Sequence, residues 1–382
     1  MSKKYKIGIN ACFTPSGGSL TQIINMVHYL SDMKYIELVI YSKKKNNSIF
    51  KNINLRNHKI TLSWLSNTSA LGRVIWEQLF LPFYVARDGI DVLFCPGNIS
   101  PIYSPIKKVQ WIGTIGPFWE KIYSYPIGIL KRIKYPLNKL LMYKSAEKAD
   151  CVIFESYYTQ KYFLNRFNIS KDRTTVINIG KDEYFTSIPN NIESNYRDQQ
   201  PFALCVSHLY SYKNIPHMIE AFSMAKRNTE SDYRLLIAGG KRSNKYYNEI
   251  TNIINKLKLK NSVILLGEVS KEDLRYLYSS CEFLIFPSPC ENFAYTLVEA
   301  MCCGAVIICS NTTAMPETCK DAALYFDPYD TEEMSEQISQ FLNNEKLRNT
   351  YRDKSIARAN ELPDFEDVTL QTLSIMRDLV NE

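Results

Sequence analysis

Two glutamates are the residues of this sequence whose types and spacing point most directly to chemistry. Glu291 and Glu299 lie in FPSPCENFAYTLVEAMCCGAVIICSNTTAMPE (286–317), which reads as a strand, a turn and a helix that stops at Gly304. The first amides of a helix favour anions and phosphates, and a carboxylate beside them can accept hydrogen bonds from hydroxyls. Amides for phosphate and two carboxylates for hydroxyls would suit a sugar attached to a nucleotide diphosphate.

The elements that would position these side chains follow a regular alternation. Short β-branched apolar runs alternate with longer amphipathic ones, which predicts parallel βαβ units with helices on both faces of each sheet. Strands are expected at 5–10, 36–41, 91–95, 107–112, 150–154 and 174–179, and again at 202–207, 234–240, 262–270, 282–288, 305–310 and 323–328. Helices are expected between them, for example at 20–33, 74–88, 159–168, 215–228 and 246–259.

A polar, aperiodic stretch interrupts this alternation and divides the chain. IPNNIESNYRDQQP, flanked by Pro189 and Pro201, is typical of an interdomain linker. The sequence therefore predicts an α/β protein of two doubly wound, Rossmann-like domains, in keeping with its 382 residues. Ligands are expected at the carboxyl ends of the strands, in a cleft between the domains. The expected parts are a first domain at 1–187, a linker at 188–200, a second domain at 201–364 and a final helix at 365–382 that packs back on the first domain.

Composition excludes several classes of protein. With 45% hydrophobic and 22% charged residues the chain is an ordinary globular one, and no run approaches the roughly 18 apolar residues of a membrane span. The start MSKKYKIGIN has no apolar signal-peptide core, so a cytoplasmic protein is expected. Most of the ten cysteines sit in apolar runs and only four histidines are present, so neither a disulfide framework nor a protein-built metal site is expected.

Positive charge is concentrated in the first half of the chain. Residues 1–200 hold 27 lysines and arginines against 14 acidic residues, whereas the remainder is acidic. The densest basic stretch, 121–148, mixes these charges with tyrosine, leucine and isoleucine, which would suit a surface resting on anionic lipid headgroups. A solvated pair of helices is the plainer interpretation, and nucleic acid is disfavoured because no known binding motif accompanies the patch. The patch residues singled out are Lys131, Arg132, Lys134, Lys139 and Lys144.

The glutamate motif in its context resembles the signature of a known enzyme family. Glu-x7-Glu preceded by FPS and followed by EAM-x-x-G, SNTTAMPE (310–317) and DAALYFDP (321–328) is similar to glycosyltransferase family 4, the retaining enzymes of GT-B architecture. SHLYSYKNIPHMIEAF (207–222) resembles the family segment with a phosphate-binding lysine. RVIWEQLFLPFYVARDGIDVLFCPGN (73–98) and ADCVIFES (149–156) resemble its acceptor domain.

The resemblance implies a role for each matching residue. Glu291 would bind hydroxyls of the transferred sugar, Glu299 would hold the ribose and Lys213 would neutralise the diphosphate. It also implies a metal-independent reaction with retained stereochemistry. The donor would be a UDP-, GDP- or dTDP-linked sugar, and no cofactor is expected. Further donor contacts are implied for His208, for the backbone of Phe293, Ala294 and Tyr295, for the base-reading turn Gly267, Glu268 and Val269, and for the loop glycines Gly17 and Gly18.

The family resemblance and the basic patch together suggest a place for the enzyme. They favour a lipid-linked saccharide acceptor, at the inner face of the cytoplasmic membrane, in assembly of a bacterial O-antigen, lipopolysaccharide or capsule. Positions in both domains depart from the family: His208 replaces an arginine, Asn292 and Ala294 replace glycines, and no histidine stands in GTIG (113–116) where the acceptor domain often has one. The changes at His208, Asn292 and Ala294 keep a non-catalytic nucleotide-sugar-binding or membrane-surface protein as an alternative. A sugar-nucleotide 2-epimerase on the same fold is the other alternative, although the context of the two glutamates argues against it.

Overall fold

The computed structural model describes residues 4–12, 18–44, 50, 58–63, 65, 69–125, 129–186 and 194–382. The chain divides into two compact units. Residues 188–193 of the predicted linker lie outside the described residues. The first unit comprises Met1–Phe118, Ile129–Gly180 and Pro363–Glu382, and the second comprises Trp119–Gly128 and Lys181–Leu362.

The first unit is built on a seven-stranded sheet in the order β3-β2-β1-β4-β5-β6-β7. Neighbouring strands pair in parallel, as the alternation of runs predicted. Buried aliphatic and aromatic side chains on both faces of these strands form the core of the unit. The strands are β1 (Tyr5–Ala11), β2 (Ile36–Lys43), β3 (His58–Ser63), β4 (Val92–Cys95), β5 (Lys107–Ile112), β6 (Cys151–Phe154) and β7 (Thr174–Val176).

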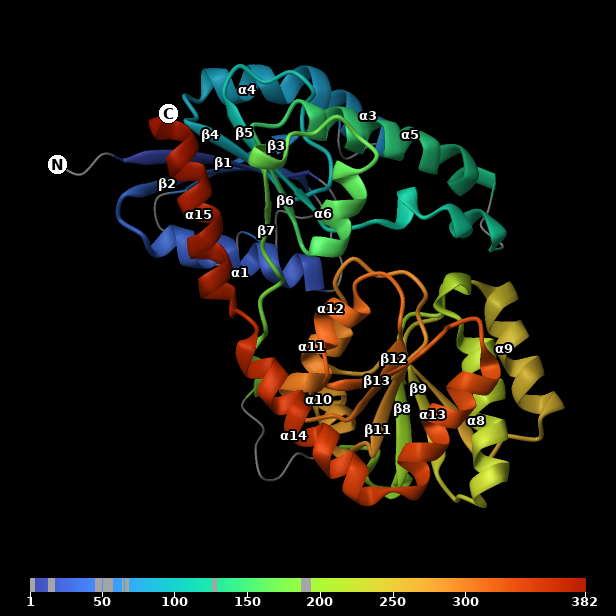
Figure 1. The fold of residues 1–382 in the computed structure, drawn as a ribbon. Coiled ribbons are helices and arrows are strands. Elements are labelled where there is room, and N and C mark those ends of the chain that lie inside the picture. Colours follow the sequence, from blue (N-terminus) through green and yellow to red (C-terminus); the bar gives the residue numbers. More distant parts are fainter. Residues whose placement is uncertain are drawn as a thin grey trace. The chain divides into compact units, whose positions relative to one another are not determined.

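Helices cover both faces of the first sheet (Figure 1). On one face, α1 (Gly18–Asp32) packs with the final helix α15 (Phe365–Asn381), whose Asn381 side chain lies 3.4 Å from the hydroxyl of Tyr5. The final helix thus belongs to the first unit. The other face carries α3 (Ala70–Ile75), the π-helix η3 (Trp76–Phe80), α4 (Leu81–Arg87), α5 (Ile129–Glu147) and α6 (Tyr157–Leu164), with the short 3-10 turns η4 (Gly116–Phe118) and η6 (Lys171–Arg173) beside them in the chain.

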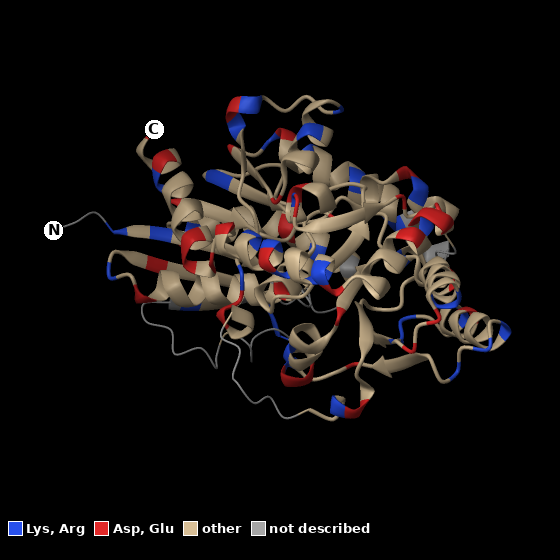
Figure 2. Cartoon of the chain, turned by 60° about the horizontal axis from the view of Figure 1, so that its bottom comes forward, with Lys and Arg blue, Asp and Glu red and all other residues tan. Residues whose placement is uncertain are grey.

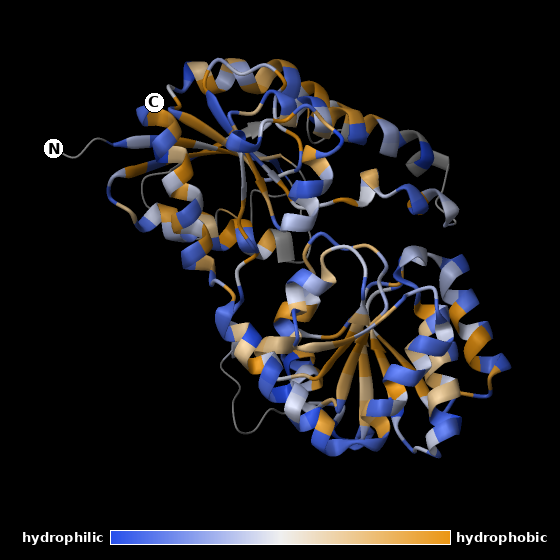
Figure 3. Ribbon diagram, in the orientation of Figure 1, coloured by the Kyte–Doolittle hydropathy of each residue, from blue (hydrophilic) through white to orange (hydrophobic). Residues whose placement is uncertain are grey.

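The second unit repeats the plan with a six-stranded parallel sheet in the order β10-β9-β8-β11-β12-β13. Its strands are almost wholly apolar, and Figure 3 shows this sheet in the hydrophobic colour. A sheet buried on both faces requires such continuous apolar strands. The strands are β8 (Phe202–Val206), β9 (Arg234–Ala238), β10 (Val263–Gly267), β11 (Phe283–Phe286), β12 (Ile307–Ser310) and β13 (Ala323–Phe326).

Helices also flank the second sheet on two sides, so the predicted pair of doubly wound domains is confirmed (Figure 1). One side carries α8 (Ile215–Thr229), α9 (Asn244–Lys256) and α13 (Thr331–Asn343). The other carries α10 (Lys271–Ser280), α11 (Tyr295–Cys302), α12 (Met315–Cys319) and α14 (Glu345–Glu361). Shorter elements of this unit are α7 (Glu183–Thr186), η5 (Glu120–Ser124), η7 (Arg197–Gln199) and η8 (Ser211–Lys213).

One segment from the first half of the chain belongs to the second unit. The expected first domain ran from 1 to 187, whereas Trp119–Gly128 and the residues from Lys181 onward group with the second unit. The reason is packing: the Lys121 ammonium lies 3.9 Å from the centre of the Tyr329 ring, in the turn after β13. Tyr125 stacks on Trp119 in the same segment, with ring centres 5.5 Å apart.

Candidate active site

The candidate site lies at the carboxyl ends of five neighbouring strands of the second sheet. In parallel α/β sheets this edge is the usual place for ligands, because the loops that leave the strands converge there. His208 and Lys213 follow β8, Arg242 follows β9, Glu268 follows β10, Glu291 follows β11 and Thr313 follows β12.

Lys213 and Glu291, predicted to act together, form a hydrogen-bonded ion pair. Both side chains are largely buried, with exposed fractions of 14% and 19%. The backbone N–H of Glu291 donates to Thr313 Oγ1 at 3.0 Å, and the Lys213 ammonium lies 5.6 Å from the centre of the Phe286 ring. Burial alone would lower the pKa of Lys213, but the Glu291 carboxylate outweighs it and raises that pKa. The lysine is therefore positively charged at neutral pH.

His208 is covered by a guanidinium group. Arg242 Nη2 lies 3.0 Å from His208 Nε2 and 3.3 Å from Nδ1, and the backbone N–H of Gly240 donates to Nδ1 at 3.2 Å. Burial and then Arg242 lower the pKa of His208, so its imidazole is neutral at pH 7. The fixed positive charge at this position is carried by Arg242.

The turn expected to read the base contributes the carboxylate that pairs with Arg242. Glu268 Oε1 lies 3.2 Å from Arg242 Nη2, and the Glu268 side chain is 67% exposed. A Cβ atom on residue 240 would come within 2.2 Å of Glu268 Oε1, so the glycine at 240 is what makes room for this side chain. The turn itself bends through Gly267 at φ +74°, with Val269 beyond Glu268.

The start of α11 follows Glu291 as predicted. Ala294 is the N-cap residue and makes no side-chain capping hydrogen bond, and no acidic residue lies in the first turn. Phe293 and Ala294 are buried, each 4% exposed, and Tyr295 is half-buried. Of the two loop glycines, Gly17 lies outside the described residues, and Gly18 is the first residue of α1 in the first unit.

Glu299 lies on α11 within a second polar cluster. Its Oε2 accepts a hydrogen bond from the Tyr278 hydroxyl at 3.1 Å. The charge of Asp182 raises the pKa of Glu299, and that of Lys271 lowers it. Lys271 and Asp182 are themselves paired at 2.7 Å. Burial raises the pKa of Glu299 to about 7, against a smaller lowering by Tyr278. This carboxyl is therefore partly protonated at neutral pH.

The predicted basic patch lies on α5 of the first unit, although its members differ in exposure. Arg132 and Lys134 are exposed. Lys144 is exposed but pairs with Glu147 at 3.0 Å, and Lys139 is half-buried with its ammonium 5.8 Å from the centre of the Phe118 ring. The side chain of Lys131 lies outside the described part of the helix. Charged residues of both signs occur on many elements of both units (Figure 2), so α5 is only one of several basic regions.

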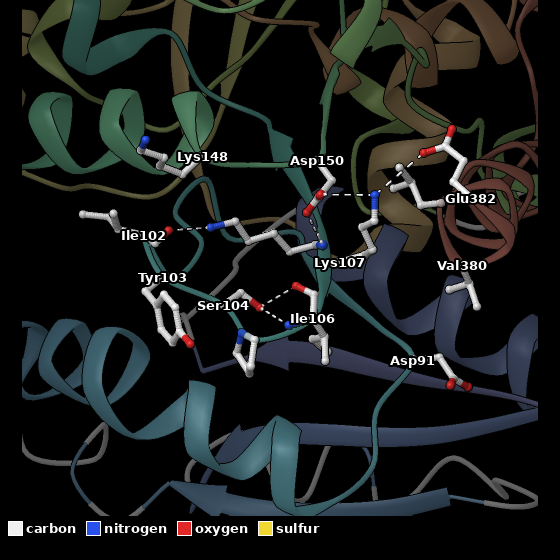
Figure 4. A pocket seen from close by; sticks show the side chains of 13 residues that line it. Asp91, Ile102, Tyr103, Ser104, Ile106, Lys107, Lys148, Asp150, Val380 and Glu382 are labelled. Atoms are coloured by element: carbon white, nitrogen blue, oxygen red, sulfur yellow. Dashed lines mark hydrogen bonds and ion pairs between the residues drawn. The ribbon is translucent and has the colours of Figure 1, made fainter.

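A cavity of about 600 Å³ opens in the first unit, at the amino-terminal edge of its sheet (Figure 4). Asp91 and Asp150 precede β4 and β6, and Lys107 begins β5, so the cavity lies at the amino ends of these strands. Lys107 Nζ lies 3.7 Å from Asp150 and 3.8 Å from Glu382. Lys107 is thus paired with two carboxylates of the cavity, and the cavity belongs to the first unit, whereas the candidate site lies on the second sheet.

Sequence reasoning missed three residues of the site. Arg242 lies 34 positions from His208, and no motif joins them. Thr313 stood inside a quoted motif without a role, and Tyr278 was given no role. The signal that could have identified Arg242 is its place just after the second apolar strand of the second domain, where a parallel sheet brings loop residues together.

The described residues contain no group of three or more histidine, cysteine, aspartate or glutamate side chains arranged to hold a metal ion. Nor does any described helix combine the length and hydropathy needed to cross a bilayer.

Comparisons with known proteins follow the same division of the chain. The family model described as Glycosyltransferase Family 4 matches residues 16–183, and the model described as Glycosyl transferases group 1 matches residues 188–358. The O-antigen chain mannosyltransferase B of Escherichia coli is 26% identical over 248 residues, and the O-antigen chain mannosyltransferase RfbU of Salmonella typhimurium is 25% identical over 295. A Campylobacter jejuni enzyme named as an N-acetylgalactosaminyltransferase acting on a diphospho-undecaprenol-linked sugar is 24% identical over 226.

These matches cover part of each relative. The aligned segment is 64% of this chain and 64% of mannosyltransferase B, 73% and 76% for RfbU, and 58% and 59% for the Campylobacter enzyme. The chain thus spans slightly less than two thirds of the length of the first of them.

Solved structures resemble the whole chain. HepE of Anabaena in complex with UDP has a TM-score of 0.76 at 17% identity, covering 98% of this chain and 100% of HepE. WaaG, described as a glycosyltransferase involved in lipopolysaccharide biosynthesis, has a TM-score of 0.74 at 15% identity, covering 97% and 99%. At such identities the likeness shows the fold. Together with the two family models it establishes that the chain is a member of glycosyltransferase family 4 with the GT-B fold.

Proposed function

We propose that this protein transfers a sugar from a nucleotide-diphosphate donor to a saccharide acceptor, with retention of configuration. The observation that carries the proposal is the buried Lys213–Glu291 pair at the carboxyl edge of the second sheet. A largely buried cation and anion that lie side by side can each bind a different part of one nucleotide-sugar donor. The lysine suits the diphosphate and the carboxylate suits the sugar hydroxyls.

The chemistry follows from these charges. As the glycosidic bond to the donor breaks, negative charge grows on the leaving diphosphate, and a fixed ammonium stabilises it without reorganising. Lys213 supplies this charge, and the amides at the start of α11 add partial positive charge. In the retaining, front-face route, the departing phosphate oxygen takes the proton of the acceptor hydroxyl. Positive side chains serve the role that a metal ion plays elsewhere, so the reaction is proposed to need no metal or cofactor.

Glu299 is proposed to bind the ribose of the nucleotide. A carboxylate accepts hydrogen bonds from two neighbouring hydroxyls, and such charge-assisted bonds are stronger than neutral ones. The Tyr278 hydroxyl fixes the carboxyl from the other side at 3.1 Å. The remaining predicted donor contacts, from the Gly267–Val269 turn and from Phe293, Ala294 and Tyr295, keep their proposed roles.

The acceptor is proposed to be a lipid-linked saccharide in the assembly of a bacterial surface polysaccharide. The names of the O-antigen mannosyltransferases and of the undecaprenol-dependent Campylobacter enzyme support this proposal. The exposed Arg132 and Lys134 of α5 fit an acceptor presented at the inner face of the cytoplasmic membrane, where lipid headgroups are anionic. The same names favour a mannosyl donor or a related hexosyl donor.

The proposal is tested first by ligand screening. UDP, GDP and dTDP at one equal concentration are compared for their effect on the melting temperature, because a ligand bound only by the folded state stabilises it, by about 2.7 kcal/mol at 100 times its Kd. One of the three should raise the melting temperature by several degrees. The matching sugar nucleotide should then release its nucleoside diphosphate when a lipid-linked saccharide is added. Binding without turnover favours the non-catalytic alternative, and an epimerised donor favours the 2-epimerase.

Arg242 is proposed to supply the second donor-binding cation, in place of the arginine that the family has at position 208. Arg242→Ala is expected to weaken binding of the nucleoside diphosphate about tenfold, because a charge-assisted hydrogen bond contributes roughly 1.5–3 kcal/mol. Adding His208→Arg to that variant should restore most of the affinity, since it returns a fixed charge to the end of β8. Isothermal titration of the unmodified protein, of Arg242→Ala and of the double variant measures this.

The control for this exchange is Lys245→Ala, which removes an exposed lysine three residues beyond Arg242. It should bind the nucleoside diphosphate as tightly as the unmodified protein does. Unchanged affinity of Arg242→Ala would remove Arg242 from the donor site. Failure of His208→Arg to rescue that variant would mean that the guanidinium acts through its contact with Glu268 and not through its charge.

A further inference from the structure

Four large apolar side chains stand exposed along one helical run of the first unit, α3–η3–α4. Leu71, Ile75, Leu79 and Phe83, here named the apolar stripe, are 62%, 37%, 69% and 65% exposed and recur at every fourth residue. Figure 3 shows this run largely in the hydrophobic colour. A single exposed leucine is ordinary, but a contiguous apolar row on a soluble surface marks an interaction site.

The π-helix in the middle of the run keeps the stripe on one side. In an α-helix each fourth residue is rotated about 40° further around the axis, so three such steps would carry the row a third of a turn away. The π-helical segment Trp76–Phe80 winds more loosely and takes back part of this rotation. Trp76 and Glu77 turn inward instead, with 0% and 1% exposed, and Glu77 Oε1 accepts a hydrogen bond from Asn10 at 3.1 Å. Because Trp76 and Glu77 are held inside the unit, the apolar stripe on the other side of the run faces outward.

The surface around the stripe is apolar and basic. The loop before β5 is tied to η3, because Gln78 accepts from the N–H of Ile102 at 2.8 Å and donates to the Ser100 carbonyl at 3.1 Å. This loop adds Ile102 and Tyr103, which are 38% and 71% exposed. The acid that follows the run, Asp88, is paired with Lys59 at 3.0 Å and with Arg87 at 2.9 Å.

Helix α5 extends this surface on the same face of the sheet (Figure 1). Right-handed crossovers running in the same direction place α4 and α5 on one face of a parallel sheet, so the outer sides of both helices face the same way. The exposed residues of α5 include Leu137 and Leu140, at 48% and 51%, together with Arg132 and Lys134. Apolar side chains bordered by cations complement an anionic lipid surface, whereas two copies of this face would repel each other.

We propose that the apolar stripe inserts among the headgroups of an anionic lipid bilayer, while the basic residues of α5 contact the lipid phosphates. The sequence analysis did not single out the stripe. It placed the membrane contact on the basic residues of α5 alone. The inference adds a docking surface to the proposed function.

Co-flotation with vesicles tests the stripe in the full-length chain. Vesicles of phosphatidylglycerol and phosphatidylethanolamine are compared with vesicles of phosphatidylcholine. The Leu79→Ser/Phe83→Ser variant should bind the anionic vesicles at least tenfold more weakly, and its melting temperature should hold because both side chains are exposed. Arg132→Gln/Lys134→Gln should weaken binding at low salt only, since 0.5 M salt screens charges but not apolar insertion.

A control variant removes two partly exposed apolar side chains outside the stripe. Leu370→Ser/Ile356→Ser, at 44% and 45% exposed on α15 and α14, should bind vesicles as the unmodified protein does. Equal binding by the stripe variant would overturn the proposal. Failure of the unmodified protein to bind anionic vesicles would also overturn it. So would sedimentation that shows the unmodified protein as a dimer and the stripe variant as a monomer. The assay uses neither sugar nucleotide nor acceptor, so its failure is distinct from failure of the proposed reaction.

Discussion

Lys213→Ala is expected to lower kcat/KM for sugar transfer by about 10²–10³-fold, with most of the loss in kcat. Losing one preorganised charge at an atom that becomes more negative in the transition state typically costs that much. Glu291→Ala should cost a similar factor, because the sugar then loses its anchoring carboxylate. Initial rates with a labelled donor measure both, and Lys245→Ala is the control for the loss of a lysine.

The variant that combines Lys213→Ala with Glu291→Ala provides a clearer test than either single substitution. Each single substitution leaves the other charge buried at 14% or 19% exposure without its partner, so each should also destabilise the free protein. Removing both should cost less stability than the two single losses combined, and should lower activity no further than either alone. Denaturant unfolding of the four proteins supplies the first comparison. Turnover by Glu291→Ala within about threefold of the unmodified enzyme would exclude the glutamate from the reaction.

Glu299→Gln is expected to weaken nucleotide binding about 30-fold at pH 8 while making the ligand-free protein more stable there. The first effect is the loss of charge-assisted hydrogen bonds to the ribose. The second follows from burial, which raises the pKa of Glu299 to about 7 against 4.5 for an ordinary glutamate. The folded protein favours the protonated form, so the stability from this group is full below about pH 4.5 and is lost as pH rises through 7.

A neutral glutamine does not suffer that loss. The variant should therefore gain about 1–3 kcal/mol over the unmodified protein between pH 5 and pH 8. In the unmodified protein, nucleotide affinity should rise about tenfold from pH 6 to pH 8, because the ribose hydroxyls favour the ionised carboxylate. Unfolding at both pH values and titration calorimetry measure these slopes. A stability difference that does not change with pH would mean that the carboxyl is ionised throughout.

The sequence predicted both sheets because buried parallel strands are continuously apolar, a pattern that is local in the chain. It missed β3 (His58–Ser63), where histidine, lysine, threonine and serine break the apolar run at the sheet edge. It read the run at 74–88 as an ordinary helix, since nothing in the spacing of its apolar residues distinguishes a π-helical turn. The segment 119–125 was assigned to the first domain because its partner, Tyr329, lies two hundred positions later in the chain.

The site was predictable only as far as its motifs reach. Glu291 and Lys213 lie 78 positions apart, and family resemblance predicted that they act together. The Arg242 contact with His208 depends on how two loops leave neighbouring strands, which no local pattern reports. The pKa of Glu299 likewise depends on burial beside Tyr278, a property of packing that residue type alone does not give.

At the carboxyl edge of the second sheet the charges are locally balanced, because Lys213 faces Glu291 and Arg242 faces Glu268. An incoming anion must therefore compete with a resident carboxylate for each cation. A small singly charged ion gains little from that exchange, whereas a diphosphate can replace both internal partners at once. In the proposed reaction, we expect the two carboxylates to pair with their cations again after transfer and so favour release of the nucleoside diphosphate. Internal carboxylates of this kind are expected to weaken binding of the nucleotide, to make binding more selective for a diphosphate and to speed product release.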